Sequence, residues 1–260
     1  RAMFTHRVIP YLKSLADGVI VSRTLKLFGI GESSMEAQLR EEMEAMTNPT
    51  LAPYAKEGEC ELRVTAKAPT DAEAQALLKP TVEQVKALFG SKVYGVDVSS
   101  LEEVVEGLLR EKGMTIGVAE SCTGGLMAKR LTDVAGASQV FLGGIVSYTN
   151  QVKAGMLHVP QHLLDQFGAV SPEVALAMAE GARKALGCDI ALATTGVAGP
   201  DKDDWDNEVG TMFVAIATPD GTHVRPLKLG SRPVRARLRT QTAHHAFDLA
   251  RRYLTGLPIG

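Results

Sequence analysis

The stretch that most constrains the fold runs from a short apolar segment, through a glycine-rich turn, into a helical pattern. Met114 to Ala119 predicts a buried strand, and Leu126 to Val134 predicts a helix. The turn between them reads Ala119-Glu120-Ser121-Cys122-Thr123-Gly124-Gly125. Helix N-termini carry unpaired N–H donors that attract anions, and glycines let a ligand approach the backbone. We therefore expect the floor of an active site here, although a capped turn without chemistry uses the same residue types.

Strand and helix patterns continue to alternate along the rest of the chain. Strands are expected at 114–119, 139–148 and 189–195, followed by a hairpin of 209–218 and 222–229. Helices are expected from Leu101, at 124–134, from about Asn150, at 172–187 and at 231–254. The hairpin makes the sheet mixed, so residues 98–260 are predicted to form a three-layer α/β domain.

A smaller unit precedes this domain. Strands are expected at 22–29, 59–68 and 91–96, with helices from Ser33 to Met46 and from Ala72 to Phe89. Thr47-Asn48-Pro49-Thr50 and Pro53 are expected to end the first helix, and Pro80 predicts a break in the second. Residues 21–97 are thus expected to form a small α+β domain, with 97–100 as the linker. Residues 1–20 resemble the end of a truncated preceding domain.

Gly29-Ile30-Gly31 raises the question of nucleic acid, because KH modules clamp the backbone of nucleic acids with a GXXG loop. The helix that follows is acidic and would repel phosphates. Its carboxylates are Glu32, Glu36, Glu41, Glu42 and Glu44. The net charge of the whole chain is −2, and no basic stripe is present. Nucleic-acid binding is therefore not expected, and a spacer or dimerisation role is favoured.

The cysteine content points to a reducing compartment. Cys60, Cys122 and Cys188 are few, unclustered and odd in number, which argues against a disulfide framework and against a zinc site. No apolar run approaches the roughly 18 residues of a transmembrane helix, and no signal peptide is apparent. We expect a cytoplasmic protein that does not associate with a membrane.

Three strand ends bring hydroxyl groups to one rim of the predicted sheet: Glu120-Ser121, Tyr148-Thr149 and Thr195-Gly196. A serine needs a base to become a nucleophile, and the histidines are poorly placed for that task. Lys153 lies one turn into the helix that starts near Asn150, and burial would lower its pKa enough for it to act as a base. Ser121 and Lys153 thus form a plausible pair, which Tyr148 could assist. A solvated lysine and a core-edge tyrosine are the structural alternative.

Arginines at the start of the last predicted helix could bind a phosphate. Arg232, Arg235 and Arg239 share one helix face, although surface ion pairs would use the same spacing. The loop from Asp201 to Glu208 is acidic and contains Trp205, the single tryptophan. Its carboxylates are irregularly spaced, as in solvated loops, so neither a metal nor another cofactor is predicted.

Several motifs together resemble the CinA family of competence/damage-inducible proteins. The turn at 119–125, Gly143-Gly144 with Tyr148 and Lys153, Gly168-Ala169-Val170-Ser171, and Thr195-Gly196-Val197-Ala198-Gly199-Pro200 have the order and spacing of the family's C-terminal domain. Residues 21–97 resemble its KH-like middle domain, with Asn48-Pro49-Thr50-Leu51-Ala52-Pro53-Tyr54-Ala55 as a second matching stretch. Residues 1–20 are similar to the end of its N-terminal domain, whose ADP-ribose pyrophosphatase activity is not assigned to this chain.

The resemblance implies an amidohydrolase that converts nicotinamide mononucleotide to nicotinic acid mononucleotide and ammonia. It implies Ser121 as the nucleophile and Lys153, with Tyr148, as the base. Further residues are implied to contact the substrate: Thr123, Gly124, Gly125, Gly144, Thr195, Arg232, Arg235 and Arg239. The family pattern Gly-Asp-Arg reads Gly230-Ser231-Arg232 here, so the arginine that binds phosphate stays open.

Two expectations about function and assembly complete this interpretation. A homodimer is expected by analogy with the family. The alternative function is a non-catalytic nucleotide-binding or scaffold module linked to DNA uptake or the damage response. The sequence offers little for that alternative, because it lacks the interleaved aromatic and basic residues of nucleic-acid-binding proteins.

Overall fold

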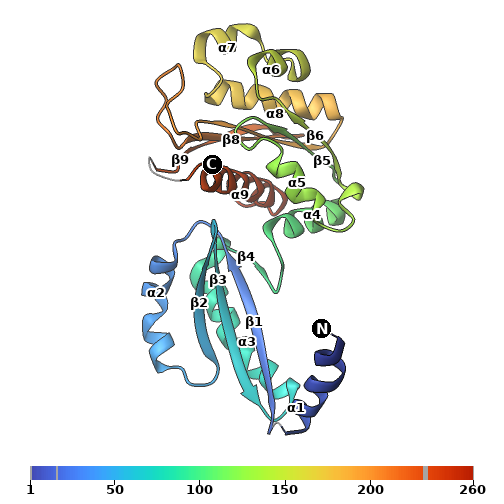
Figure 1. Ribbon diagram of the computed structural model, residues 1–260, viewed down its shortest axis with the longest axis vertical. Helices are drawn as coiled ribbons and strands as arrows, with labels where there is room; N and C mark the ends of the chain where they lie inside the picture. The colour runs from blue at the N-terminus through green and yellow to red at the C-terminus, as the bar shows by residue number, and fades with distance from the viewer. Residues whose placement is uncertain (1, 16, 231–233, 260) are drawn as a thin grey trace. The chain divides into compact units, whose positions relative to one another are not determined.

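The computed structural model describes residues 2–15, 17–230 and 234–259. The chain divides into two compact units, residues 1–98 and residues 99–260. The first contains an antiparallel four-stranded sheet and the second a mixed five-stranded sheet, which confirms the predicted fold classes (Figure 1).

The sheet of the first unit has the strand order β2-β3-β1-β4. Its strands are β1 (Val19–Leu27), β2 (Thr50–Lys56), β3 (Glu59–Ala68) and β4 (Val93–Val96). Its helical segments are η1 (Phe4–Val8), α1 (Ile9–Leu15), α2 (Glu32–Ala45), α3 (Asp71–Phe89) and η2 (Gly90–Lys92). Apolar side chains of α2 and α3 meet those of β1 and β3 in one core, as the alternating burial of β3 requires.

Three predictions for this unit were wrong. The predicted order lacked strand β2, because Pro53 was interpreted only as a residue that ends the first helix; β2 pairs only with β3 and so lies at a sheet edge, where a residue without an N–H is tolerated. Helix α3 continues through Pro80, whose side chain faces solvent while Leu78 and Val82 on either side pack in the core. Helix α2 begins at Glu32 with Gly31 as its N-cap, without the capping box expected at Ser33.

The sheet of the second unit has the order β6-β5-β7-β8-β9. Its strands are β5 (Ile116–Glu120), β6 (Phe141–Val146), β7 (Ile190–Gly196), β8 (Thr211–Thr218) and β9 (Gly221–Lys228). Strands β6, β5 and β7 are parallel, and the β8–β9 hairpin adds the antiparallel part. The carboxyl ends of the three parallel strands therefore share one rim, which is where open α/β sheets bind ligands.

Helices cover both faces of this sheet. The helical segments are α4 (Leu101–Lys112), α5 (Leu126–Thr132), η3 (Ala137–Gln139), α6 (Asn150–Leu157), α7 (Gln161–Phe167), α8 (Pro172–Leu186) and α9 (Arg235–Leu254). Helices α6, α7 and α8 lie on one face, and α4, α5 and α9 lie on the other (Figure 1). Helix α7 was not predicted, because its seven residues carry too short an apolar pattern.

Helices α6 and α8 approach each other closely at Gly181. A methyl group built on Gly181 would lie 1.9 Å from the carbonyl oxygen of Leu157, the last residue of α6. Backbone atoms on both sides cannot move aside as a flexible side chain would. This contact fixes the distance between α8 and the helix that carries Lys153.

We predict that Gly181→Ala lowers the free energy of unfolding of the second unit by about 2 kcal/mol or more, because the added methyl group forces the two helices apart. The matched control is Gly107→Ala in α4, where nothing lies within 4 Å of the added methyl group and stability should rise by up to about 1 kcal/mol. Urea unfolding followed by the emission of Trp205 measures both variants. Equal stabilities would contradict the packing described here.

Candidate active site

Ser121 follows directly on β5 and is fixed by the neighbouring strand β7. Its N–H donates to the carbonyl oxygen of Thr194 at 3.0 Å, which extends the β5–β7 ladder by one residue. The hydroxyl groups of Thr123 and Thr194 lie 2.7 Å apart and are fully buried. The turn that carries Ser121 is thus tied to β7 by backbone and side chain.

The N-terminus of α5 is occupied by a side chain of the protein. Glu120 is fully buried, and its carboxylate accepts hydrogen bonds from the N–H groups of Gly125, Met127 and Ala128 at 2.8–3.0 Å. These N–H groups are the donors that we expected to bind an anion, and the Glu120 carboxylate already occupies them. The N–H of Gly125 is therefore not available for binding. The backbone N–H of Thr123 has no hydrogen-bond acceptor among the described residues.

Lys153 lies beneath this turn. Helix α6 begins at Asn150, with the Thr149 hydroxyl accepting from the N–H of Val152 at 3.3 Å, so that Lys153 comes one turn into the helix. Its side chain is 1% exposed. Its Nζ lies 3.1 Å from the Oγ of Ser121 and 2.9 Å from the carbonyl oxygen of Ser147.

Burial changes the acid–base behaviour of this amine. The loss of hydration lowers the pKa of Lys153 from 10.5 to about 8. At pH 7 roughly a tenth of the amine is then neutral, compared with roughly one part in three thousand for an ordinary lysine. A neutral Nζ can accept the proton of the Ser121 hydroxyl, which makes the pair competent for nucleophilic chemistry.

Other candidates for nucleophile and base are less suitable. Burial raises the pKa of the Cys122 thiol to about 12, so this thiol stays protonated next to Ser121. Burial also lowers the pKa of His245 to about 4, and the side chain lies within α9. Serine with lysine is the pair that the geometry brings together.

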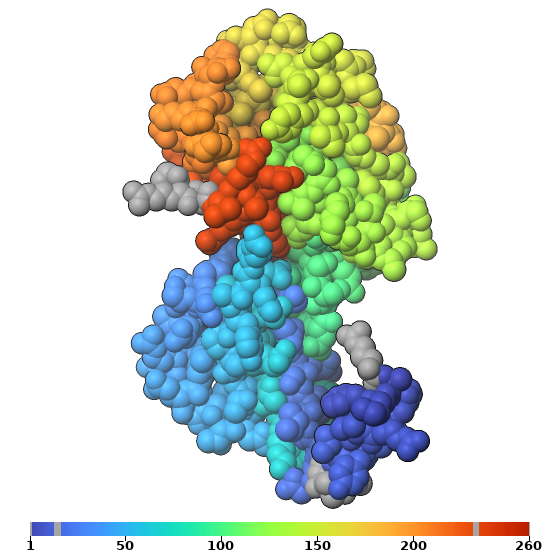
Figure 2. Space-filling model, viewed as in Figure 1, coloured from blue at the N-terminus to red at the C-terminus, as the bar shows by residue number. Residues whose placement is uncertain are grey.

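Tyr148 contacts an arginine and not the lysine. Its side chain is 60% exposed, and its hydroxyl oxygen accepts a hydrogen bond from Nη2 of Arg235 at 3.2 Å. Nη1 of the same guanidinium donates to the carbonyl oxygen of Gly199 at 2.6 Å. Arg235 thus joins the segments after β6 and β7 to the start of α9. In Figure 2 the start of α9, in red-orange, reaches the surface between the orange and yellow-green segments.

The other predicted arginines have different surroundings. Arg239 lies one turn after Arg235, and its Nη2 donates to the carbonyl oxygen of Thr123. Arg232 lies outside the described residues, so the expectation that it shares a helix face with Arg235 and Arg239 stays a prediction. Helix α9 begins at Arg235, after Val234 in an extended conformation, and not at residue 231 as predicted.

Three further predicted site residues are engaged in packing or internal hydrogen bonds. The Thr195 hydroxyl is buried and donates to the carbonyl oxygen of Ala169 at 2.7 Å, which holds the segment before α8 against β7. Gly144 lies within β6, where an added methyl group would come within 2.7 Å of Val118. A methyl group built on Gly124 would lie 3.5 Å from Nη2 of Arg239.

Besides the Glu120 carboxylate, the sequence interpretation missed two groups that shape the site. One is Thr194, which contacts both Ser121 and Thr123; its position just before the strand end could have indicated it. The other is the carbonyl of Ser147, which accepts from Lys153 and which no side-chain pattern could reveal.

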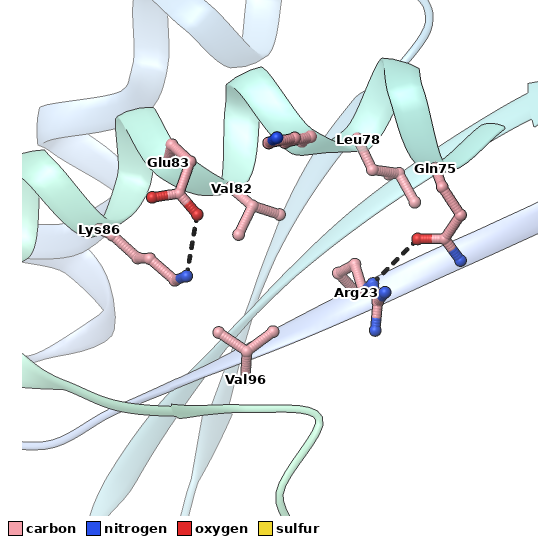
Figure 3. Close-up of a pocket in the computed structure, with 8 residues that line it drawn as sticks. Arg23, Gln75, Leu78, Val82, Glu83, Lys86 and Val96 are labelled. Carbon is pink, nitrogen blue, oxygen red and sulfur yellow. Dashed lines mark hydrogen bonds and ion pairs between the residues drawn. The ribbon is translucent and has the colours of Figure 1, made fainter. Parts of the chain in front are cut away.

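A concavity lies in the first unit, between α3 and strands β1 and β4 (Figure 3). It has a volume of about 360 Å³, an apolar floor that includes Leu78 and Val82, and a charged rim. Two of the rim cations are paired, Arg23 with Asp97 and Lys86 with Glu83. Its lining offers neither a hydroxyl nor a thiol nor an imidazole. This concavity therefore offers no nucleophile of the kind found at Ser121.

The described ranges contain neither a cluster of metal ligands nor a membrane-spanning helix. There, no three side chains of histidine, cysteine, aspartate or glutamate gather as a metal site would require. None of the helices found between residues 2 and 259, outside the gaps given above, has the length and apolarity to cross a bilayer.

The low pKa of Lys153 predicts a pH-dependent stability. The folded pKa lies below the unfolded one, so the unfolded chain binds more protons between pH 8 and pH 10.5, and stability rises with pH in that window. Lys153→Met lacks this titration. We expect its stability relative to the parent chain to fall by about 2–3 kcal/mol from pH 7 to pH 10.5, measured by urea unfolding. A difference that stays constant with pH would contradict a desolvated amine.

Known proteins share both the sequence and the fold. Residues 98–254 match the family described as CinA C-terminal domain, and residues 22–95 match the Damage-inducible protein CinA KH domain. A CinA-like protein of Dictyoglomus turgidum is 43% identical over 255 residues, which are 98% of this chain and 62% of that protein. A CinA-like protein of Desulfovibrio desulfuricans is 43% identical over 99% of this chain and 60% of its own length. The chain thus spans about three fifths of these relatives.

Solved structures agree over the second unit. The competence damage-inducible protein A of Klebsiella pneumoniae has a TM-score of 0.58 and 26% identity, and the match covers 60% of this chain and 95% of that one. The competence/damage inducible protein CihA of Agrobacterium tumefaciens has a TM-score of 0.56 and 34% identity over 61% and 97% of the two chains. The motifs, the fold and these matches together show that the chain belongs to the CinA family of competence/damage-inducible proteins.

Proposed function

We propose that residues 99–260 hydrolyse the carboxamide of nicotinamide mononucleotide, giving nicotinic acid mononucleotide and ammonia. The observation that carries the proposal is the buried Lys153 amine 3.1 Å from the Ser121 hydroxyl, at the rim where three parallel strands end. The choice of substrate comes from the resemblance to the family. The arginines at the start of α9 support it, because they suit a phosphate group.

The first half of the reaction forms an ester with the enzyme. The neutral Nζ of Lys153 takes the proton of the Ser121 hydroxyl as Oγ attacks the carboxamide carbon. The negative charge that develops on the amide oxygen is stabilised by the Thr123 N–H, one of the donors of the turn without an acceptor among the described residues. When the tetrahedral intermediate collapses, the C–N bond breaks and the Lys153 ammonium returns its proton to the departing nitrogen, which leaves as ammonia.

The second half consumes one water molecule. Lys153, neutral again, takes a proton from the water as its oxygen attacks the ester carbon. Collapse of this second intermediate breaks the bond to Oγ, and Lys153 returns the proton to Ser121. One amide and one water have become one carboxylic acid and one ammonia, and the enzyme is restored.

Arg235 and Arg239 are the proposed phosphate ligands. Arg235 presently donates to Gly199 and Tyr148, and Arg239 donates to Thr123. A phosphate would offer both guanidinium groups stronger, charge-assisted hydrogen bonds than neutral oxygens do. Substrate binding is thus proposed to exchange the contacts of Arg235 for the phosphate and to release Tyr148.

We also propose that the protein acts as a homodimer.

Replacement of either member of the pair should abolish turnover. We predict that Ser121→Ala and Lys153→Ala each reduce ammonia release from nicotinamide mononucleotide by at least about 10²-fold, because the nucleophile or its base is lost. The assay is run in the presence of a chelator, since no step above calls for a metal. Lys129→Ala removes an exposed lysine of α5 and serves as the control that retains activity. Normal turnover in either active-site variant would exclude this mechanism.

The pH dependence of kcat/KM follows from the pKa of Lys153. The base must be neutral, so kcat/KM should rise about tenfold per pH unit below pH 8 and level off above it. Initial rates of ammonia release from pH 6 to pH 9.5 measure this profile. A profile that is flat across this range would show that the titration of this amine does not control the rate.

A further inference from the structure

Trp205 is the single tryptophan of the chain, and it lies half exposed in the loop between β7 and β8. Its indole packs directly on Gly168, where an added methyl group would come within 2.6 Å of Cδ1. Gly168 has a positive φ of 73° and could not carry a side chain without strain. One side of the ring is therefore covered by backbone, while 50% of the side chain remains accessible.

Hydrogen bonds fix this loop in place. Oδ1 of Asp203 accepts from the N–H groups of Trp205 and Asn207 at 3.1 and 2.8 Å. The side-chain amide of Asn207 donates to the carbonyl oxygen of Val170 at 3.4 Å. The loop thus contacts the segment 168–170 at two points: the Trp205 ring packs on Gly168, and the Asn207 amide donates to Val170. An exposed aromatic ring that is held in this way presents a fixed surface to solvent.

A short series of contacts links the ring to the nucleophile. Gly168 carries the indole, and the next residue, Ala169, accepts the hydrogen bond of Thr195 at 2.7 Å. Thr195 follows Thr194, whose carbonyl oxygen accepts from the N–H of Ser121. The same loop carries Gly199, which accepts from Arg235. Trp205 therefore belongs to the rim that carries the candidate catalytic pair and the phosphate-binding arginines.

Two segments of this rim differ in charge. The segment 201–208 contains five carboxylates and one lysine, whereas the start of α9 contributes Arg235 and Arg239. A substrate with a cationic ring and an anionic phosphate matches that division. Electron-rich indole is also the aromatic side chain that attracts cations best.

From these observations, and resting on the proposed function, we propose that Trp205 is the platform on which the pyridinium ring of the substrate stacks, and that it selects N-substituted pyridinium carboxamides over carboxamides with uncharged rings. The carboxamide then extends from the stacked ring toward Ser121, and the phosphate lies toward α9.

Fluorescence tests the platform without altering Trp205. Because the chain has one tryptophan, its indole emission reports on Trp205 alone. Nicotinamide mononucleotide should quench this emission saturably in the Ser121→Ala variant, where the ligand is not consumed. Its reduced form, which has an uncharged ring, and ribose 5-phosphate should quench far less. Collisional quenching rises without saturation and is distinguished in this way. Absence of saturable quenching, while the parent chain hydrolyses nicotinamide mononucleotide, would overturn the platform and leave the proposed function standing.

Kinetics of two variants provide the second readout. Trp205→Ala should raise KM for nicotinamide mononucleotide on the order of tenfold, the effect of one lost ring stack, while kcat changes less than about twofold. Trp205→Phe keeps an aromatic face and should raise KM less. An unchanged KM in Trp205→Ala would overturn the platform. Saturable quenching of the parent chain without ammonia release would support the platform and reject the proposed hydrolysis.

Discussion

The hydrogen bond between the Lys153 amine and the Ser121 hydroxyl depends on a buried cation, and the rest of the site is arranged around it. An isolated ammonium group in a protein interior is destabilising unless oxygen atoms surround it. Here the carbonyl of Ser147 and the hydroxyl of Ser121 supply them. Two oxygens solvate an ammonium less well than water does, which is why the pKa falls to about 8.

Glu120 places both of those oxygens. Its backbone carbonyl accepts from the N–H of Ser147 at 2.8 Å, which fixes the exit of β6, and its carboxylate fixes the start of α5. Ser121 is the next residue along the chain. One buried residue at the end of the central β5 therefore sets the position of the nucleophile, of the turn behind it and of the carbonyl that holds the base. The N-terminus of α5 is used for this structural purpose, and we propose that a substrate phosphate binds instead to side chains at the start of α9.

Much of this arrangement could be predicted from the sequence. Because parallel strands end on one rim, the positions of Ser121 and Lys153 in the pattern were enough to suggest that they meet. The occupancy of the α5 N-terminus by Glu120 was not foreseen, since a glutamate at a strand end is usually exposed and nothing local shows that its carboxylate turns inward. The contact between Tyr148 and Arg235 joins residues 87 positions apart, which local spacing cannot reveal. In the first unit, strand β2 with Pro53 was missed and Pro80 was wrongly expected to break a helix. The cost of a proline depends on whether its position is at a sheet edge or faces solvent, which is a property of the tertiary structure.

The most direct test of the central claim is a measurement of the pKa of Lys153 itself. The side-chain resonance of this lysine can be followed by NMR from pH 6 to pH 11 and assigned by its absence from Lys153→Met. Our account predicts a midpoint near pH 8, below the ordinary lysine value of 10.5. A midpoint near 10.5 would mean that the amine is hydrated and charged at neutral pH, and that Ser121 has no base beside it.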